Sequence, residues 1–110
     1  YPLRWDAPVD PLDFTKLGTL EFAAPDEETF RCLPLARHAG AVGGTLPCAM
    51  NAANEVAVAA FLARKCAWLD IVRAIEHALN RASFAAAPTL ADYAAADGEA
   101  RRLAAEFLAL

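Results

Sequence analysis

Alanine dominates this chain and constrains its fold more than any other feature. The 110 residues include 28 alanines and 14 leucines, and apolar residues make up 57% of the sequence. Alanine has the highest intrinsic helix propensity and leucine lies close behind it, whereas β-branched residues are few and there are only five glycines. This composition opposes a β-sandwich or barrel and predicts a mostly α-helical domain. It also supplies more apolar surface than a free-standing domain of this size needs.

The charge balance is mildly acidic. Ten Lys and Arg residues against 14 Asp and Glu residues give a formal net charge of −4 at pH 7. A chain without a basic block is a poor candidate for binding nucleic-acid phosphates. The longest uncharged apolar run, Val56–Ala63, is far shorter than the roughly 20 residues that cross a bilayer. We therefore expect neither a nucleic-acid nor a membrane partner.

The N-terminal residues predict an extended linker. Pro2, Pro8 and Pro11 fix the backbone of the first eleven residues, and Tyr1–Asp10 shows none of the features of a signal peptide. Position 1 is not Met, so we expect the chain to be a segment of a longer protein. We assign residues 1–25 to the linker and residues 26–110 to a helical domain.

Five large apolar side chains between Leu12 and Phe22 need a surface on which to pack. The spacing predicts a helical turn at Asp13–Leu17 and a short strand at Thr19–Phe22. One short strand cannot form a sheet by itself. We expect its partner strand to lie outside this chain or in a second copy of it.

About four helices are expected after the linker. Asp26 begins a single turn that reaches Phe30, and the first helix proper starts near Leu33, with Pro34 in its first turn. This helix ends near Ala41, because Gly43-Gly44 follows.

The second helix, Asn51–Lys65, is apolar on nearly all sides and is expected to be the central one. Its N-cap is either Asn51 or Thr45, the latter with Pro47 in the first turn.

Two further helices complete the predicted bundle. The third covers about Asp70–Arg81, and the last begins after Thr89, with Asp92 three residues on as a capping partner. Gly98 lies inside the last helix, where glycine is unfavourable, and marks either a kink or a break.

Cysteine and histidine give no sign of a metal or redox centre. Cys32, Cys48 and Cys66 form no C-x-x-C pair, and their odd number suits no closed disulfide set, so we expect buried thiols in a reducing compartment. His38 and His77 belong to no metal-ligand motif.

Other reactive residue types are also best explained structurally. Ser83 lies in no nucleophile elbow. Gly40, Gly43 and Gly44 form neither a P-loop nor a dinucleotide fingerprint. The acidic run Asp26–Glu28 suits the positive end of a helix.

Asn51, Asn54 and Glu55 form the most distinctive polar group. They lie at i, i+3 and i+4 of an otherwise apolar helix and therefore share one side of it. We expect a small buried network that caps the helix and fixes the preceding loop. A ligand-binding role for the three residues is the alternative.

Several ordered motifs resemble the C-terminal region of 1-deoxy-D-xylulose 5-phosphate reductoisomerases. The strongest is Asn51-Ala52-Ala53-Asn54-Glu55-Val56. The others are Leu12-Asp13-Phe14, Leu17–Phe22, Pro25-Asp26, Ala59-Ala60-Phe61-Leu62, Asp70-Ile71, and Asp97 with Ala100 and Arg101. The chain departs from the family pattern at Arg31, where the family has proline, and at Gly98, where alanine is more usual.

The resemblance implies a function for a longer parent protein. Members of the family rearrange deoxyxylulose phosphate and reduce it to methylerythritol phosphate in non-mevalonate isoprenoid synthesis, with NADPH and Mg²⁺ or Mn²⁺. They are homodimers with a Rossmann-like NADPH domain, a catalytic domain, a linker and a C-terminal helical domain. The family's substrate and metal ligands precede the region that this chain resembles. The resemblance therefore implies that this chain holds no catalytic, cofactor-binding or metal-binding residue. It also implies a cytoplasmic location, or a plastid location in a plant or alga.

Three hypotheses follow. The first is a structural domain that is inactive alone and packs on the NADPH and catalytic domains of its own polypeptide. The second is a free-standing helical interaction module. The third makes Asn51, Asn54 and Glu55 catalytic, and it is the weakest because the chain lacks a glycine fingerprint for a dinucleotide.

Overall fold

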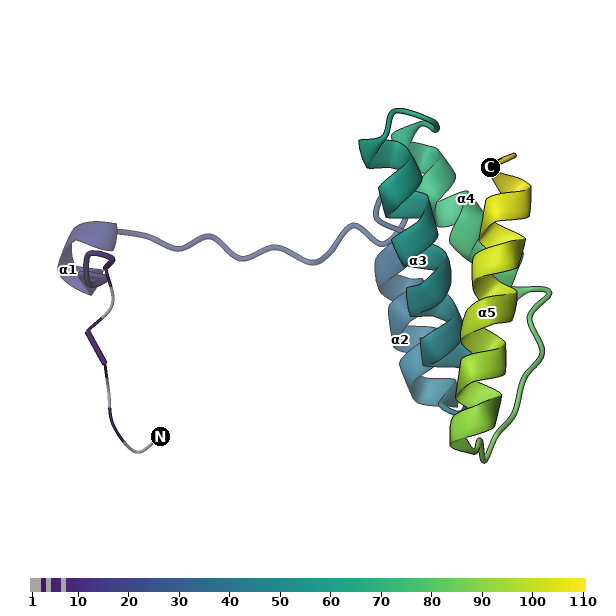
Figure 1. Ribbon diagram of the computed structural model, residues 1–110. Coiled ribbons are helices and arrows are strands. Elements are labelled where there is room, and N and C mark those ends of the chain that lie inside the picture. The colour runs from purple at the N-terminus through teal and green to yellow at the C-terminus, as the bar shows by residue number, and fades with distance from the viewer. Residues whose placement is uncertain (1–2, 4, 7) are drawn as a thin grey trace.

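A computed structural model describes residues 3, 5–6 and 8–110 and confirms a mostly α-helical chain. Four longer helices pack into a bundle, and one short helix, α1, lies apart from it at the end of an extended segment (Figure 1). The helices are α1 (Phe14–Leu17), α2 (Cys32–Val42), α3 (Leu46–Leu62), α4 (Trp68–Leu79) and α5 (Leu90–Phe107).

The N-terminal part of the chain, here called the arm (residues 8–25), contains α1 and an extended stretch. The Asp13 carboxylate caps α1 by accepting a hydrogen bond from the Thr15 amide at 2.9 Å. The strand expected at Thr19–Phe22 does not form: these residues are extended but pair with no strand in the described part of the chain. A strand requires a neighbour to bond its amides and carbonyls, and none is within reach. Tyr1, Pro2, Arg4 and Ala7 of the predicted linker lie outside the described residues.

The bundle begins with the turn predicted at Asp26. The Asp26 carboxylate accepts a hydrogen bond from the Thr29 amide at 2.9 Å, and α2 follows from Cys32. Gly43, with φ of +73°, ends α2 as predicted, because a left-handed residue stops the helical bonding pattern.

Helices α3 and α4 both begin earlier than Asn51 and Asp70, the first residues of the two helices predicted from the sequence. Helix α3 begins at Leu46, so Thr45 occupies the N-cap position and Pro47 lies in the first turn. Helix α4 begins at Trp68, because the Asp70 carboxylate reaches back to the Ala67 amide at 2.9 Å and so belongs to the first turn.

Helix α5 is continuous from Leu90 to Phe107, so of the kink or break expected at Gly98, the break is absent. Thr89 and Asp92 form the predicted capping box: the Asp92 amide donates to the Thr89 hydroxyl at 3.3 Å, and the Thr89 amide donates to the Asp92 carboxylate at 2.8 Å. The helical bonding of α5 tolerates one exposed glycine, which costs only about 1 kcal/mol relative to alanine.

Helix α3 is central, as predicted, and packs against α2, α4 and α5. Its buried face consists of small side chains, which allow the neighbouring helices to approach closely. Ile75 on α4 is the largest fully buried side chain. The remaining core is mostly alanine: Ala49, Ala52, Ala53 and Ala57 of α3, Ala74 and Ala78 of α4, and Ala100 and Ala104 of α5.

Candidate functional site

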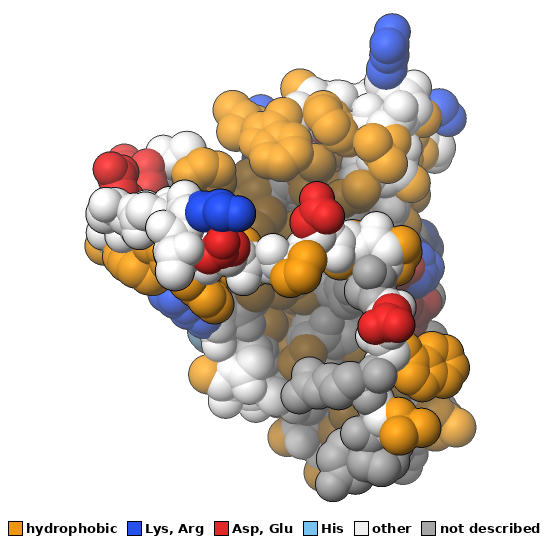
Figure 2. All heavy atoms as spheres, turned by 90° about the vertical axis from the view of Figure 1, so that its left-hand side faces the viewer, with side chains coloured by type: hydrophobic (Ala, Val, Ile, Leu, Met, Phe, Trp, Pro, Cys, Tyr) orange, Lys and Arg blue, Asp and Glu red, His pale blue; other side chains and the backbone are white. Residues whose placement is uncertain are grey.

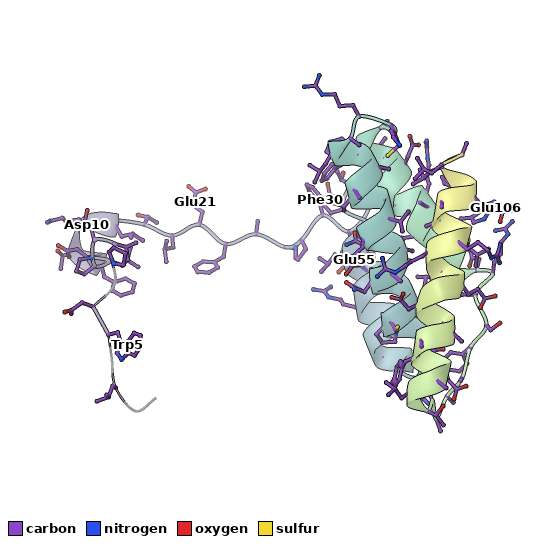
Figure 3. The ribbon with its side chains drawn as sticks, in the orientation of Figure 1. Trp5, Asp10, Glu21, Phe30, Glu55 and Glu106 are labelled. Atoms are coloured by element: carbon purple, nitrogen blue, oxygen red, sulfur yellow. The ribbon has the colours of Figure 1, made fainter. Side chains whose placement is uncertain are left out.

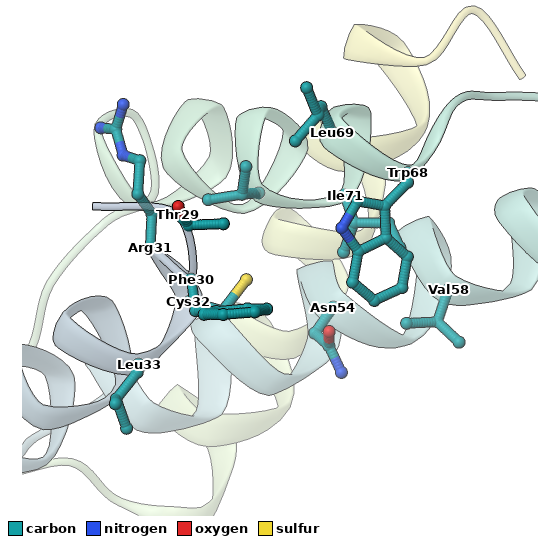
Figure 4. Close-up of a pocket in the computed structure, with 11 residues that line it drawn as sticks. Thr29, Phe30, Arg31, Cys32, Leu33, Asn54, Val58, Trp68, Leu69 and Ile71 are labelled. Carbon is teal, nitrogen blue, oxygen red and sulfur yellow. The ribbon is translucent and has the colours of Figure 1, made fainter. Parts of the chain in front are cut away.

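The structure separates the three polar residues that the sequence placed in one network. The Asn51 side-chain amide donates to Glu55 Oε1 at 3.0 Å, and both residues are exposed. Asn54 is half-buried and lines a pocket on a neighbouring side of α3 (Figure 4). The prediction of a buried network that fixes the preceding loop is therefore wrong. The loop ends at Thr45, more than a helical turn earlier, and residues three apart on a helix diverge by about 60°.

Arg101 on α5 completes a different cluster. Its guanidinium donates to Glu55 Oε2 at 2.7 Å and to both oxygens of Asp97 at 2.7 and 3.1 Å. We call Asn51, Glu55, Asp97 and Arg101 the α3–α5 polar cluster. Glu55 faces this side of α3 (Figure 3). Sequence reasoning missed Arg101 as a partner of Glu55, although the i, i+4 spacing of Asp97 and Arg101 was a signal of an ion pair.

In the α3–α5 polar cluster, one guanidinium is shared between two carboxylates, and each carboxylate is paired with it. Hydrogen bonds from Arg101, and then from Asn51, hold the pKa of Glu55 below its ordinary value. Arg101 likewise lowers the pKa of Asp97, and these two carboxylates, Asp97 first, raise the pKa of Arg101. A general base needs a pKa near the working pH. The pKa values of Glu55 and Asp97 are instead lowered, away from neutral pH. Such carboxylates suit a structural ion pair that links α3 to α5.

A pocket of about 390 Å³ lies where the start of α2 meets α3 and α4 (Figure 4). Most of its walls are apolar side chains. The lining residues are Thr29, Phe30, Arg31, Cys32, Leu33, Asn54, Val58, Trp68, Leu69, Ile71 and Val72. Burial, and then the nearby Glu76 carboxylate, raise the pKa of the Cys32 thiol. A protonated thiol is a poor nucleophile, so the pocket offers apolar contact surface in place of reactive groups.

The remaining candidate residues serve local structure. All three cysteines are free, but they are half-buried and not fully buried as expected. The Cys48 thiol donates to the Tyr93 carbonyl oxygen at 3.6 Å, and that of Cys66 donates to the Ala57 carbonyl oxygen at 3.8 Å. The Ser83 amide donates to Glu99 at 2.8 Å.

His77 and part of the acidic run also serve local structure. The His77 ring packs on Phe107 at 5.1 Å between centroids. In the acidic run, Asp26 caps a turn and Glu27 pairs with Arg37. Over residues 3, 5–6 and 8–110, no three His, Cys, Asp or Glu side chains gather as metal ligands would, and no helix is long and apolar enough to cross a membrane.

Sequence comparison identifies relatives along almost the whole chain. Residues 1–103 match the family described as the DXP reductoisomerase C-terminal domain. The 1-deoxy-D-xylulose 5-phosphate reductoisomerase of Pseudomonas savastanoi pv. phaseolicola is 49% identical over 108 residues, which is 98% of this chain and 27% of that protein. The Bacteroides thetaiotaomicron protein of the same name is 49% identical over 98% of this chain and 28% of its own length.

Comparison with solved structures identifies the same kind of relative. The reductoisomerase of Zymomonas mobilis in complex with NADPH superposes with a TM-score of 0.84 at 45% identity, over 98% of this chain and 29% of that one. A DOX-P reductoisomerase in complex with NADPH, fosmidomycin and magnesium gives a TM-score of 0.88 at 36% identity, over 100% of this chain and 29% of that one. The chain thus spans just over a quarter of the length of the curated relatives that it matches, and it belongs to the DXP reductoisomerase C-terminal domain family.

Proposed function

We propose that this chain is the helical C-terminal domain of a 1-deoxy-D-xylulose 5-phosphate reductoisomerase. The observation that carries the proposal is the match of residues 1–103 to that domain family, supported by superposition on two solved reductoisomerases with bound NADPH over 98% and 100% of the chain. Residues 1–25 would be the linker to the rest of the polypeptide and residues 26–110 the domain itself. The whole protein would work as a homodimer in the bacterial cytoplasm or in a plastid.

The reaction would belong to the whole polypeptide. By its resemblance to the family, that protein would rearrange deoxyxylulose phosphate and reduce the product to methylerythritol phosphate. One solved relative holds NADPH, and another holds NADPH, magnesium and fosmidomycin. We expect this protein to use the same cofactors, NADPH and Mg²⁺ or Mn²⁺, at groups outside residues 1–110.

The role of this chain would be support. Glu55, Asp97 and Arg101 of its α3–α5 polar cluster form ion pairs with one another. Its pocket is lined mainly by apolar side chains. Both features suit a body that packs on other protein. We expect the isolated chain to bind neither NADPH nor Mg²⁺ and to have no activity.

Two measurements test this proposal. The full-length polypeptide should oxidise NADPH in the presence of deoxyxylulose phosphate and Mg²⁺, and the isolated chain should not. Isothermal titration of the isolated chain with NADPH or Mg²⁺ should give no binding heat. Micromolar binding of either to the isolated chain, or a full-length polypeptide without this activity, would overturn the proposal. A gene that starts directly before Tyr1 would favour a free-standing interaction module.

A further inference from the structure

Residues 26–31, here called the junction, connect the arm to α2. Ahead of them, residues 18–25 are extended and form neither a turn nor a helix. Within the junction, the Phe30 amide donates to the Asp26 carbonyl oxygen at 3.0 Å, and the Thr29 amide donates to the Asp26 carboxylate at 2.9 Å. Figure 3 shows the change from the extended arm to the bundle at Phe30. Local hydrogen bonding therefore begins where the arm ends.

Two ion pairs attach the junction to the bundle. The Glu27 carboxylate pairs with Arg37, which lies in the middle of α2. The Arg31 guanidinium pairs with Glu76 on α4, 45 residues later in the chain. The Glu76 side chain is only 25% exposed, so dissolved ions screen this pair less than a fully exposed one. The junction is thus bonded to two different helices.

The two ion pairs act together on one short segment. A single turn does not hold its shape alone, because ordering each residue costs conformational entropy that one or two hydrogen bonds only partly return. One exposed ion pair adds little by itself. Once one pair has formed, however, the other closes with less loss of freedom, because its partners are already held near each other. Apolar burial is a weaker restraint on the junction, since Phe30 remains 59% exposed.

The course of the arm depends on the junction. In the described part of the chain, no backbone hydrogen bond involves residues 18–25. The arm nevertheless carries large apolar side chains: Phe14 is 74% exposed and Phe22 is 90% exposed. Hydrophobic side chains also dominate the side of the molecule from which the arm projects (Figure 2). The junction is therefore the last place at which the bundle can fix the direction in which these side chains are presented.

We propose that the Glu27–Arg37 and Arg31–Glu76 ion pairs form an electrostatic clasp that fixes the direction in which the arm leaves the bundle. When the clasp opens, the turn at Asp26 unfolds locally and the arm gains a pivot next to α2. Because each pair has an exposed member, the clasp loosens as ionic strength rises. The clasp goes beyond the proposed function, and its test requires no enzymatic activity.

Amide hydrogen exchange of the 110-residue chain tests the clasp. Arg37→Met and Glu76→Gln each remove one partner and leave the sequence of the junction unchanged. Each should speed the exchange of the Thr29 and Phe30 amides several-fold, and the two together about tenfold, because each exposed pair shifts a local opening equilibrium by a small factor. Glu106→Gln is the matched control, because it breaks an exposed ion pair within α5. It should leave the exchange of both amides unchanged.

Salt and backbone dynamics supply two further readouts. Raising the salt concentration to about 1 M, where the Debye length is about 3 Å, should speed exchange of the two amides in the wild type but not in the doubly substituted chain. NMR order parameters in the wild type should be about 0.85 for residues 27–30 and below about 0.6 for residues 19–24. Order parameters below about 0.6 at residues 27–30 would overturn the inference. Exchange that neither the two substitutions nor salt alters would also overturn it.

Discussion

Thr45 and Ala85 are joined by two hydrogen bonds that run in opposite directions. The Thr45 amide donates to the Ala85 carbonyl oxygen at 3.0 Å, and the Ala85 amide donates to the Thr45 hydroxyl oxygen at 3.1 Å. Thr45 is only 2% exposed and stands at the N-cap position of α3, while Ala85 lies in the loop between α4 and α5. The pair holds that loop against the start of α3 and so positions the beginning of α5.

Replacing Thr45 by valine tests this pair. Thr45→Val keeps the shape of the side chain but leaves the amide of half-buried Ala85 without this acceptor, which should lower the free energy of unfolding by about 0.5–1.5 kcal/mol. Urea unfolding followed by circular dichroism measures the change. Thr45→Ser retains the hydroxyl and should lose less. An unchanged free energy of unfolding in Thr45→Val would mean that the hydrogen bond to Ala85 does not stabilise the chain.

Gly44 makes the same contact possible and should tolerate no side chain. Its φ is +56°, and a Cβ there would lie 2.3 Å from the Ala85 carbonyl oxygen. Gly44→Ala should therefore lower the thermal midpoint markedly, since strain of the backbone alone costs about 1–2 kcal/mol. Gly40→Ala is the matched control: Gly40 lies inside α2 with open space around it, so alanine should raise the midpoint. An unchanged thermal midpoint in Gly44→Ala would show that the loop around Ala85 does not pack closely against Gly44.

The alanine faces of the bundle predict sensitivity to larger side chains. Ala57 is fully buried on α3, whereas Ala59 on the same helix is exposed. Ala57→Leu should overpack the contact of α3 with its neighbours and cost about 1–3 kcal/mol or more. Ala59→Leu should change the free energy of unfolding by less than about 0.5 kcal/mol. Similar results for the two variants, measured by urea unfolding, would contradict the close packing of α3.

Local sequence signals predicted most of the bundle. The Thr89–Asp92 capping box and the stop at Gly43 depend on residues within one turn, and both formed as expected. The start of α3 was ambiguous because Asn51 and Thr45 are both good N-cap types. Thr45 occupies that position, but its hydroxyl bonds across to Ala85 instead of capping its own helix.

The missed features depend on groups that are distant in sequence. Glu55 meets Arg101 only because α3 and α5 pack side by side. Asn54 lines a pocket whose walls also come from α2, the turn before it, and α4. The strand expected at Thr19–Phe22 needs a partner that is not in the described part of the chain. Periodicity places a residue on one face of its helix but does not say which helix will face it.

The α3–α5 polar cluster predicts a dependence of stability on pH. The pKa of Glu55 and that of Asp97 are lower in the folded chain than their ordinary values of 4.5 and 3.8. A lowered pKa means that the contribution of each group is fully present above its ordinary value and is lost as pH falls through the folded value. The thermal midpoint should therefore fall on acidification below about pH 5.

Substitution of Arg101 isolates this contribution. Arg101→Met removes the largest cause of both pKa shifts, so its thermal midpoint should fall less steeply with acid than that of the wild type. Arg102→Met is the control, because Arg102 pairs with Glu106, at 3.0 Å, outside the cluster. It should keep the pH dependence of the wild type. Parallel curves for the wild type and Arg101→Met would show that the cluster contributes nothing to stability.

Gly98 offers a test of the continuity of α5. It lies mid-helix, and a Cβ built there meets no atom within 4 Å. Gly98→Ala should therefore raise the free energy of unfolding by about 0.5–1 kcal/mol, because alanine loses less backbone entropy on entering a helix. The reverse change at the exposed Ala94 of the same helix, Ala94→Gly, should lower it by a similar amount. If Gly98→Ala destabilised the chain while Ala94→Gly behaved as expected, α5 would have to bend at Gly98, as the unusual glycine at this position first indicated.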